Sequence, residues 1–132
     1  MKKIVLGVVL VCALAVLSVV VYDNLQFYNR LQSALYSDFS ESYPSLTRVE
    51  YELLRKRPTV TGVAVPKYYV WVRLYSRDGL LDEAAIRCAD DVEGFSVLQV
   101  RTREEIRRDP NVLDVFPKAL IPDIEKRAGV VK

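Results

Sequence analysis

The chain of 132 residues contains no histidine and only two cysteines, Cys12 and Cys88. Without histidine, Ser-His-Asp triads, Cys-His dyads and histidine metal sites are impossible. Two cysteines are too few for a disulfide framework or a four-cysteine zinc site within one chain. The five glycines are scattered, so there is no glycine-rich phosphate loop. The sequence therefore predicts a protein that is not an enzyme and that holds no cofactor or metal.

A net basic charge is also missing from most of the chain. The formal charge is +2, and both excess positive charges, Lys2 and Lys3, precede a long apolar run. Residues 23–132 hold 17 basic and 17 acidic side chains. Nucleic-acid-binding proteins usually carry a basic excess or a one-sided basic patch. We therefore expect no nucleic-acid partner.

The apolar run covers residues 4–21 without one charged side chain. As a helix it would span roughly 27 Å, close to the bilayer core of about 30 Å. Tyr22 follows as an aromatic residue suited to the membrane interface. The basic residues before the run place the N-terminus in the cytoplasm by the positive-inside rule. Residues 1–22 are thus predicted to be a signal anchor in the cytoplasmic (inner) membrane, with the rest of the chain outside.

A cleaved signal peptide is the alternative interpretation. Ala13 and Ala15 have the small-x-small spacing of a cleavage site. However, the apolar core of a secretory signal is usually about 7–15 residues long. Cleavage there would also leave residues 16–21 as an apolar new terminus. An uncleaved anchor fits better.

The helical period continues beyond the membrane. Leu25, Tyr28, Leu31 and Leu35 follow a spacing of three and four residues, which predicts an amphipathic stalk helix ending near residue 37. This apolar stripe needs a partner, and either the protein's own sheet or a second chain would serve. The expected divisions of the chain are residues 1–22, 23–44 and 45–132.

The period changes after the stalk. Val49, Tyr51 and Leu53 alternate with charged residues, which predicts a half-buried strand. A helix over residues 46–57 is the alternative, because the leucine spacing there also fits one. Residues 58–66 are rich in β-branched side chains and begin and end with proline, so we expect a loop or a short edge strand.

The middle of the chain predicts an antiparallel meander of three to four strands. Asp78-Gly79 is a strong tight-turn pair. On the last strand, Leu98 and Val100 are expected to form the apolar face. Besides the strand after the stalk, the expected strands cover residues 68–76, 84–89 and 95–101.

The end of the chain predicts short helices. Thr102 and Glu105 have the spacing of a capping box, which starts a helix over residues 103–108. Residues 112–121 are too apolar for a free tail and are expected to pack on the sheet. Gly129 is expected to close a last helical turn. The whole chain is therefore predicted to be α+β: a membrane-plus-stalk helix, a small antiparallel sheet and short C-terminal helices.

One face of the best strand carries Tyr69, Trp71, Arg73 and Tyr75 in succession. Aromatic and arginine side chains are enriched in the energetic centres of protein interfaces. We therefore interpret these four residues as a partner-binding surface, with a glycan or small ligand as a second possibility. The alternative is that the N-terminal helix or the C-terminal tail covers this face.

Two patterns of carboxylates are weaker signals of a functional site than this aromatic strand face. Glu50 and Glu52 would lie about 7 Å apart on one strand face, a spacing that glycosidases use but that is common elsewhere. Their alternation with Arg48 favours a solvated sheet face. The acidic residues Asp90, Asp91 and Glu93 lack the alternating ligand pattern of a calcium loop, which favours a solvated hairpin turn.

An apolar helix that runs into a small antiparallel sheet resembles type IV pilin-like subunits in outline. The sequence lacks their basic leader ending in glycine and the glutamate early in their apolar segment. The resemblance implies a homomeric filament subunit. Our main prediction is an accessory or scaffolding subunit of an envelope complex, whose outer domain binds other proteins, or itself. A glycan or small-ligand sensor is a further alternative.

Overall fold

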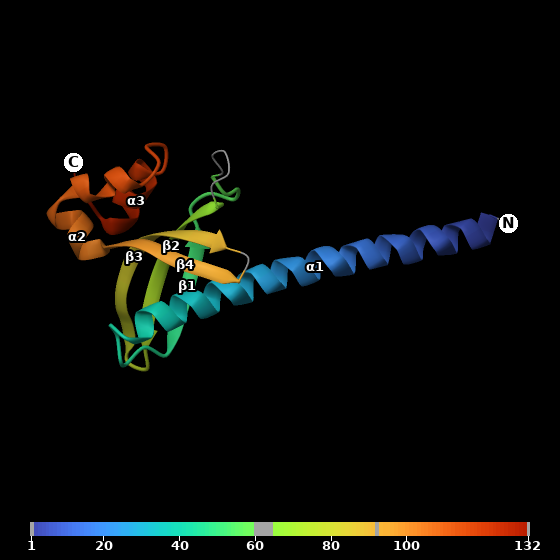
Figure 1. The fold of residues 1–132 in the computed structure, drawn as a ribbon, viewed down its shortest axis with the longest axis horizontal. Helices are drawn as coiled ribbons and strands as arrows, with labels where there is room; N and C mark the ends of the chain where they lie inside the picture. Colours follow the sequence, from blue (N-terminus) through green and yellow to red (C-terminus); the bar gives the residue numbers. More distant parts are fainter. Residues whose placement is uncertain (1, 60–64, 92, 132) are drawn as a thin grey trace.

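The computed structural model describes residues 2–59, 65–91 and 93–131. Helix α1 (Lys2–Ser40) projects far beyond a small sheet, and the short C-terminal helices lie at the other end of the molecule (Figure 1). The apolar window of this helix has no buried residue and is long and apolar enough to cross a membrane. The α+β fold predicted from the sequence is confirmed.

Helix α1 is continuous because neither glycine nor proline occurs between residues 8 and 43. It ends three residues beyond the predicted position. Every fourth residue of its last part packs on the sheet, which makes one stripe along the helix. The stripe consists of Phe27, Leu31, Leu35 and Phe39.

The sheet is an antiparallel meander in the order β1-β2-β3-β4. Its first strand confirms the strand interpretation of residues 46–57 over the helical one. The predicted tight turn joins β2 to β3, and Gly79 follows it with a φ of 130°, which a side chain would strain. The sequence places Asp90 and Asp91 in a hairpin turn, but in the structure they belong to β3 and pair with Phe95 and Gly94 of β4. The strands are β1 (Arg48–Leu53), β2 (Lys67–Ser76), β3 (Gly79–Asp91) and β4 (Gly94–Thr102).

The connection from β1 to β2 was predicted to be a loop or a short edge strand. Thr59 forms an isolated antiparallel bridge with Lys67. Residues 60–64 lie outside the described residues.

The apolar face of β4 differs from the prediction. Val100 packs against the core with Phe95 and Val97, whereas Leu98 is 44% exposed. The cause is a register shift opposite Arg87 and Cys88, which places one extra β4 residue between two pairs. Such an insertion turns the following side chains to the other face. Strict alternation from Val100 therefore assigned Leu98 to the wrong face.

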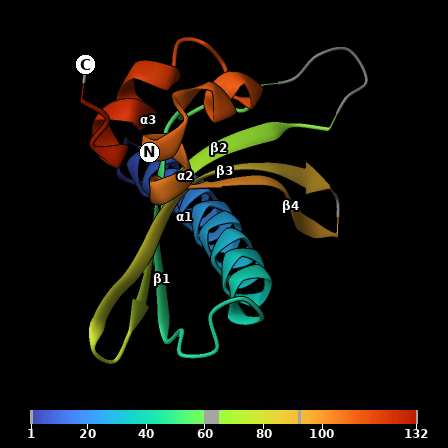
Figure 2. The same cartoon turned by 90° about the vertical axis from the view of Figure 1, so that its left-hand side faces the viewer.

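The sheet is covered on both faces. Helix α1 packs on one face, against Val70, Val72 and Leu74 of β2. The C-terminal elements cover the opposite face near Trp71 (Figure 2). They are α2 (Arg103–Arg108), the 3-10 helix η1 (Pro110–Val115) and α3 (Ile121–Ala128).

The ends of the C-terminal helices follow the predicted signals. Thr102 and Glu105 make both hydrogen bonds of the capping box at the start of α2. Gly129 closes α3 in the left-handed conformation, with φ 76°. Leu113, Phe116 and other apolar residues of the tail are buried, as expected.

Candidate interaction surface

The aromatic side chains at the start of β2 are core residues. Tyr69 is 5% exposed and Trp71 is 1% exposed. Both belong to the cluster that the C-terminal elements form, in which Tyr69 and Phe116 have ring centroids 6.0 Å apart. The alternative in which the tail covers this face is therefore the correct one. A partner-binding role for these two residues is not supported, because their side chains are not accessible.

The other two residues of that face make contacts within the chain. Arg73 pairs with Glu83 at 3.2 Å, and the second oxygen of Glu83 binds Arg103 at 3.0 Å. Arg48 lies 4.3 Å above the centre of the Tyr75 ring. The side chains of Arg73 and Tyr75 are only half-buried, but each is held by a neighbouring side chain rather than presented on an open face.

The four predicted stalk contacts divide into two pairs. Leu31 and Leu35 are fully buried against the protein's own sheet. Leu25 and Tyr28 are 55% and 50% exposed. The Tyr28 ring lies 5.2 Å from that of Tyr51. The domain's own sheet thus uses half of the stripe that a second chain would need.

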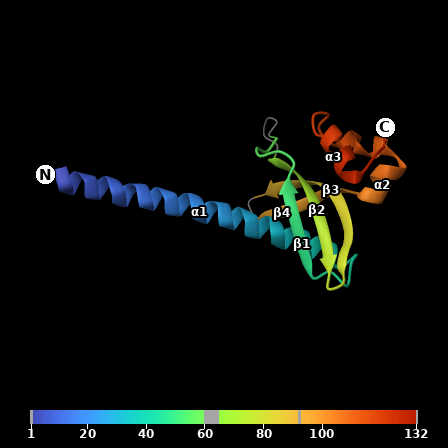
Figure 3. The same cartoon turned by 180° about the vertical axis from the view of Figure 1, so that it is seen from behind.

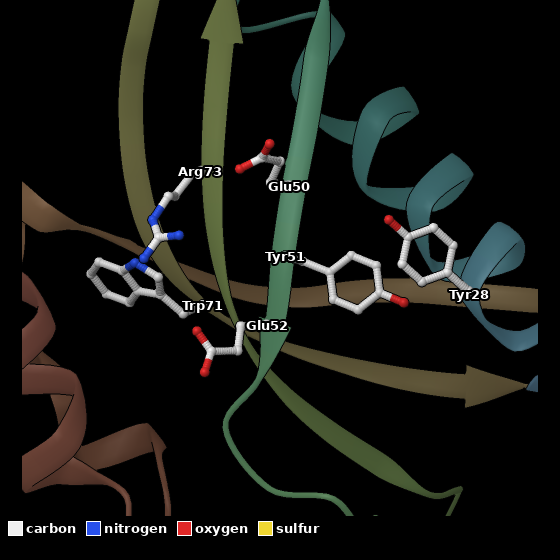
Figure 4. A pocket seen from close by; sticks show the side chains of 6 residues that line it. All are labelled: Tyr28, Glu50, Tyr51, Glu52, Trp71 and Arg73. Atoms are coloured by element: carbon white, nitrogen blue, oxygen red, sulfur yellow. The ribbon is translucent and has the colours of Figure 1, made fainter.

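A hollow of about 380 Å³ straddles β1 (Figure 4). Tyr28 and Tyr51 meet on the α1 side, whereas Glu50 and Glu52 lie on the other side with Trp71 and Arg73. Arg127 of α3 binds both oxygens of Glu52, at 2.8 and 3.0 Å.

Hydrogen bonding from Arg127 lowers the pKa of Glu52 and keeps it ionised, which does not suit a general acid. Glu50 faces Arg48 at 3.6 Å. Both carboxylates therefore face arginines of the same chain, Glu52 facing Arg127 and Glu50 facing Arg48.

The acidic residues of β3 also act within the fold. Arg30 of α1 binds Asp90 at 2.5 Å, and Tyr43 donates to Asp82 at 2.5 Å. Within the described ranges, no three acidic or cysteine side chains are grouped so that they could hold a metal ion. Burial raises the pKa of the Cys88 thiol to about 12, and this residue is a small core side chain.

The two edges of the sheet differ in what faces them. Leu54 N–H donates to Tyr69 C=O, so the backbone groups of Val49 and Tyr51 point away from β2. Helix α1 lies beside this edge (Figure 3). The Gln32 side chain donates to Val49 C=O at 2.5 Å, and Tyr36 donates to the carbonyl of Leu46 at 3.2 Å. Helix α1 thereby satisfies one outward acceptor of the β1 edge, the Val49 carbonyl, and a second carbonyl just before the strand.

The β4 edge is open. Asp90 N–H donates to Pro66 C=O on the β2 side, so the neighbours of Asp90 face β4 and pair with Gly94 and Ser96. Because successive residues alternate, the backbone groups of Phe95 and Val97 point outward. Among the described residues, no side chain donates to or accepts from either of these two backbones.

A groove runs between this open edge and α1. Two adjoining hollows of about 460 and 410 Å³ share Ala34 and Phe95 as lining residues. On the helix side, the groove is lined by small side chains, including Ser33 and Ser37, which leave space beside the strand. We name this space the α1–β4 groove; its charged lining residues are Arg30, Asp38, Glu41 and Glu93.

The α1–β4 groove is acidic. Arg30 already pairs with Asp90. In the described part of the chain, no ion pair engages Asp38, Glu41 or Glu93. Partial burial and the nearby Glu41 carboxylate raise the pKa of Asp38. Three carboxylates thus line the groove with no positive charge left to balance them.

Sequence reasoning did not find this groove. The stalk prediction rests on the apolar stripe of α1 and assigns no role to its small residues. The small residues Ser33, Ala34 and Ser37 were a usable signal, because small side chains allow another backbone to approach a helix. The predicted meander makes its first and last strands the edges of the sheet, but the position of α1 relative to these two edges is not given by the sequence.

Comparison with known proteins gives no relative for the chain. The chain matches no protein-family model, no curated protein and no solved structure.

Proposed function

We propose that this protein is a single-pass, membrane-anchored subunit whose domain outside the cytoplasm binds another protein of the envelope. It would act as an accessory or scaffolding subunit and catalyse no reaction. The N-terminus would lie in the cytoplasm and α1 would cross the inner membrane. Lys2 and Lys3 before the apolar run support this orientation.

The observation that carries the proposal is the α1–β4 groove. Gln32 of α1 satisfies an outward carbonyl on the β1 edge, whereas the β4 edge combines outward backbone groups, small helix residues and unbalanced carboxylates. Sheet edges left open in this way are docking sites for other chains. The groove replaces the aromatic face as the candidate interaction surface.

The continuity of α1 supports an anchored function. Phe27, which contacts Tyr68 and Phe95, follows the apolar run by six residues, or about 9 Å of helix. No glycine or proline interrupts the connection. The domain would thus be held at a fixed height and rotation above the membrane, where a membrane-bound partner can meet the groove.

The test is capture of the partner by crosslinking of tagged full-length protein in intact membranes. Ser37→Trp fills the groove, whereas Ser42→Trp places the same side chain on an exposed turn outside it. We expect Ser37→Trp to reduce capture at least tenfold and Ser42→Trp to leave it unchanged. Equal capture by both variants would refute the groove as the docking site.

The homomeric filament alternative gives a different result in the same experiment. It requires helix association through the stalk stripe, of which Leu25 and Tyr28 remain exposed. Capture of the protein's own copies alone, lost on Leu25→Ala and retained in Ser37→Trp, would favour that alternative.

A further inference from the structure

The strongest unused feature is the backbone of the open β4 edge, and an inference from it rests on the function proposed above. We propose that the partner inserts an extended, basic segment into the α1–β4 groove, where it pairs with β4 as a fifth strand of the sheet. The proposal names both the mode of binding and the chemistry of the partner.

The backbone geometry favours strand addition. Phe95 and Val97, whose backbone groups point outward from the sheet, line the two hollows together with Ser33, Ala34 and Ser37 of the helix. An added strand lies about 4.8 Å from its neighbour. Its backbone would meet the β4 edge, and its side chains would alternate between the helix and the opposite side.

The negative charge of the α1–β4 groove favours a basic segment of the partner. Asp38 and Glu41 lie at one end of the groove and Glu93 at the other, and Arg30 is occupied by Asp90. Lysine or arginine side chains on the added strand would meet these carboxylates. An acidic segment would add like charges to a site that already has three.

A second copy of this chain fits less well. Pairing through its β1 edge would compete with the hydrogen bond that its own Gln32 makes to the outward Val49 carbonyl. Its β4 edge would bring a second set of carboxylates, including Asp38 and Glu41, against the first. The groove therefore favours a different protein over self-pairing, and the experiment separates the two.

The experiment places a photo-crosslinking amino acid at Ser37 of the full-length protein in intact membranes, followed by sequencing of the attached peptide. We expect a segment of another protein, rich in lysine or arginine. Hydrogen exchange of the purified complex should slow at the Phe95 and Val97 amides at least tenfold relative to the protein alone. An acidic segment, a segment of this chain, or unchanged exchange at both amides would overturn the inference.

Two variants probe the backbone bond. Val97→Pro removes an outward N–H that makes no ladder bond, a position where proline is tolerated. Val97→Thr keeps that N–H. We expect capture to fall at least tenfold in the proline variant and to persist in the threonine variant, with equal thermal unfolding as the check on folding. If both variants lose capture of the partner equally, hydrogen exchange at the Phe95 and Val97 amides decides whether the inference stands.

Charge reversal probes the partner's chemistry. Glu41→Lys should reduce capture several-fold. Asp114→Lys, on an exposed residue of η1 remote from the groove, should not. Equal capture in both would contradict a basic segment.

The outcomes also separate this inference from the proposed function. If Ser37→Trp abolishes capture but Val97→Pro does not and the amides stay unprotected, the groove binds its partner by side chains alone. The inference then fails and the proposed function stands. If no protein is captured from any groove position, both fail.

Discussion

The side-chain amide of Gln32 on α1 donates a hydrogen bond to the backbone carbonyl of Val49 on β1. This carbonyl points outward from the first strand, where an unpaired acceptor would otherwise invite another chain. The contact ties helix α1 to the β1 edge of the sheet and satisfies one of the outward acceptors there. The opposite edge, at Phe95 and Val97, has no equivalent cap in the described residues. The two edges thus differ in whether a side chain of α1 bonds their outward backbone groups.

Removal of this cap should weaken the attachment of α1 to the sheet. In Gln32→Leu the size of the side chain is kept, but Val49 loses its donor. We expect the unfolding free energy to fall by about 1 kcal/mol, the usual net value of one hydrogen bond. Thermal unfolding of the full-length protein in detergent measures the change. Gln26→Leu, on an exposed position of the same helix, should have little effect.

The sequence predicted most of the fold because its local signals agree with the tertiary structure. The apolar helix, the alternation at Val49, the Asp78-Gly79 turn and the Thr102 capping box each formed as expected. Leu98 was assigned to the wrong face because a register shift depends on the pairing of two strands. Local patterning does not encode that pairing.

The candidate site was harder to predict for a different physical reason. An aromatic strand face looks the same in sequence whether solvent or a C-terminal helix covers it. Trp71 is buried because Leu113, Phe116 and Ile124 return to it from more than 40 residues away. The predicted meander identifies the outermost strands, but the groove beside β4 depends on where α1 crosses the sheet, which is a long-range relationship.

We expect Trp71 to be essential for folding. It is 1% exposed and lies in the cluster that joins the sheet to α3. Trp71→Ala leaves a large cavity there, and truncations of buried tryptophan cost about 3–5 kcal/mol. That is a large share of the stability of a small domain. We expect a strongly lowered melting temperature for the full-length protein. Tyr75→Ala, on a half-buried ring, should cost much less.

An unchanged melting temperature in Trp71→Ala would contradict its place in the core. If such a stable variant also lost its partner, the original surface interpretation of β2 would regain support.

Stability should decline at alkaline pH. Burial raises the pKa of Cys88, Tyr43 and Tyr51 to about 12, from ordinary values of 9.0 for the thiol and 10.0 for the phenols. In the folded protein these groups keep their protons at a pH where the unfolded chain loses them. Their contribution is therefore complete below about pH 9 and is lost as the pH rises toward 12.

Melting temperatures of the full-length protein measured from pH 8 to pH 11.5 test this expectation. The decline should be smaller in Tyr51→Phe, because a phenyl ring has no proton to lose. A melting temperature that stays constant over this range would be inconsistent with the burial of these groups.

The left-handed turn at Gly129 should be needed to hold α3 on the sheet. Its φ is 76°, a conformation that costs a residue with a side chain about 1–2 kcal/mol. A Cβ atom there would also lie 2.7 Å from the Arg107 guanidinium, which binds Ala128 C=O through Nε. We expect Gly129→Ala to destabilise the packing of the C-terminal helices on the sheet by at least about 1–2 kcal/mol. Gly94→Ala is the matched control, because its Cβ meets nothing within 4 Å and its φ is not positive. Limited proteolysis after α2 should accelerate in the first variant and not in the second. Equal cleavage of the two would show that the turn at Gly129 does not hold α3 in place.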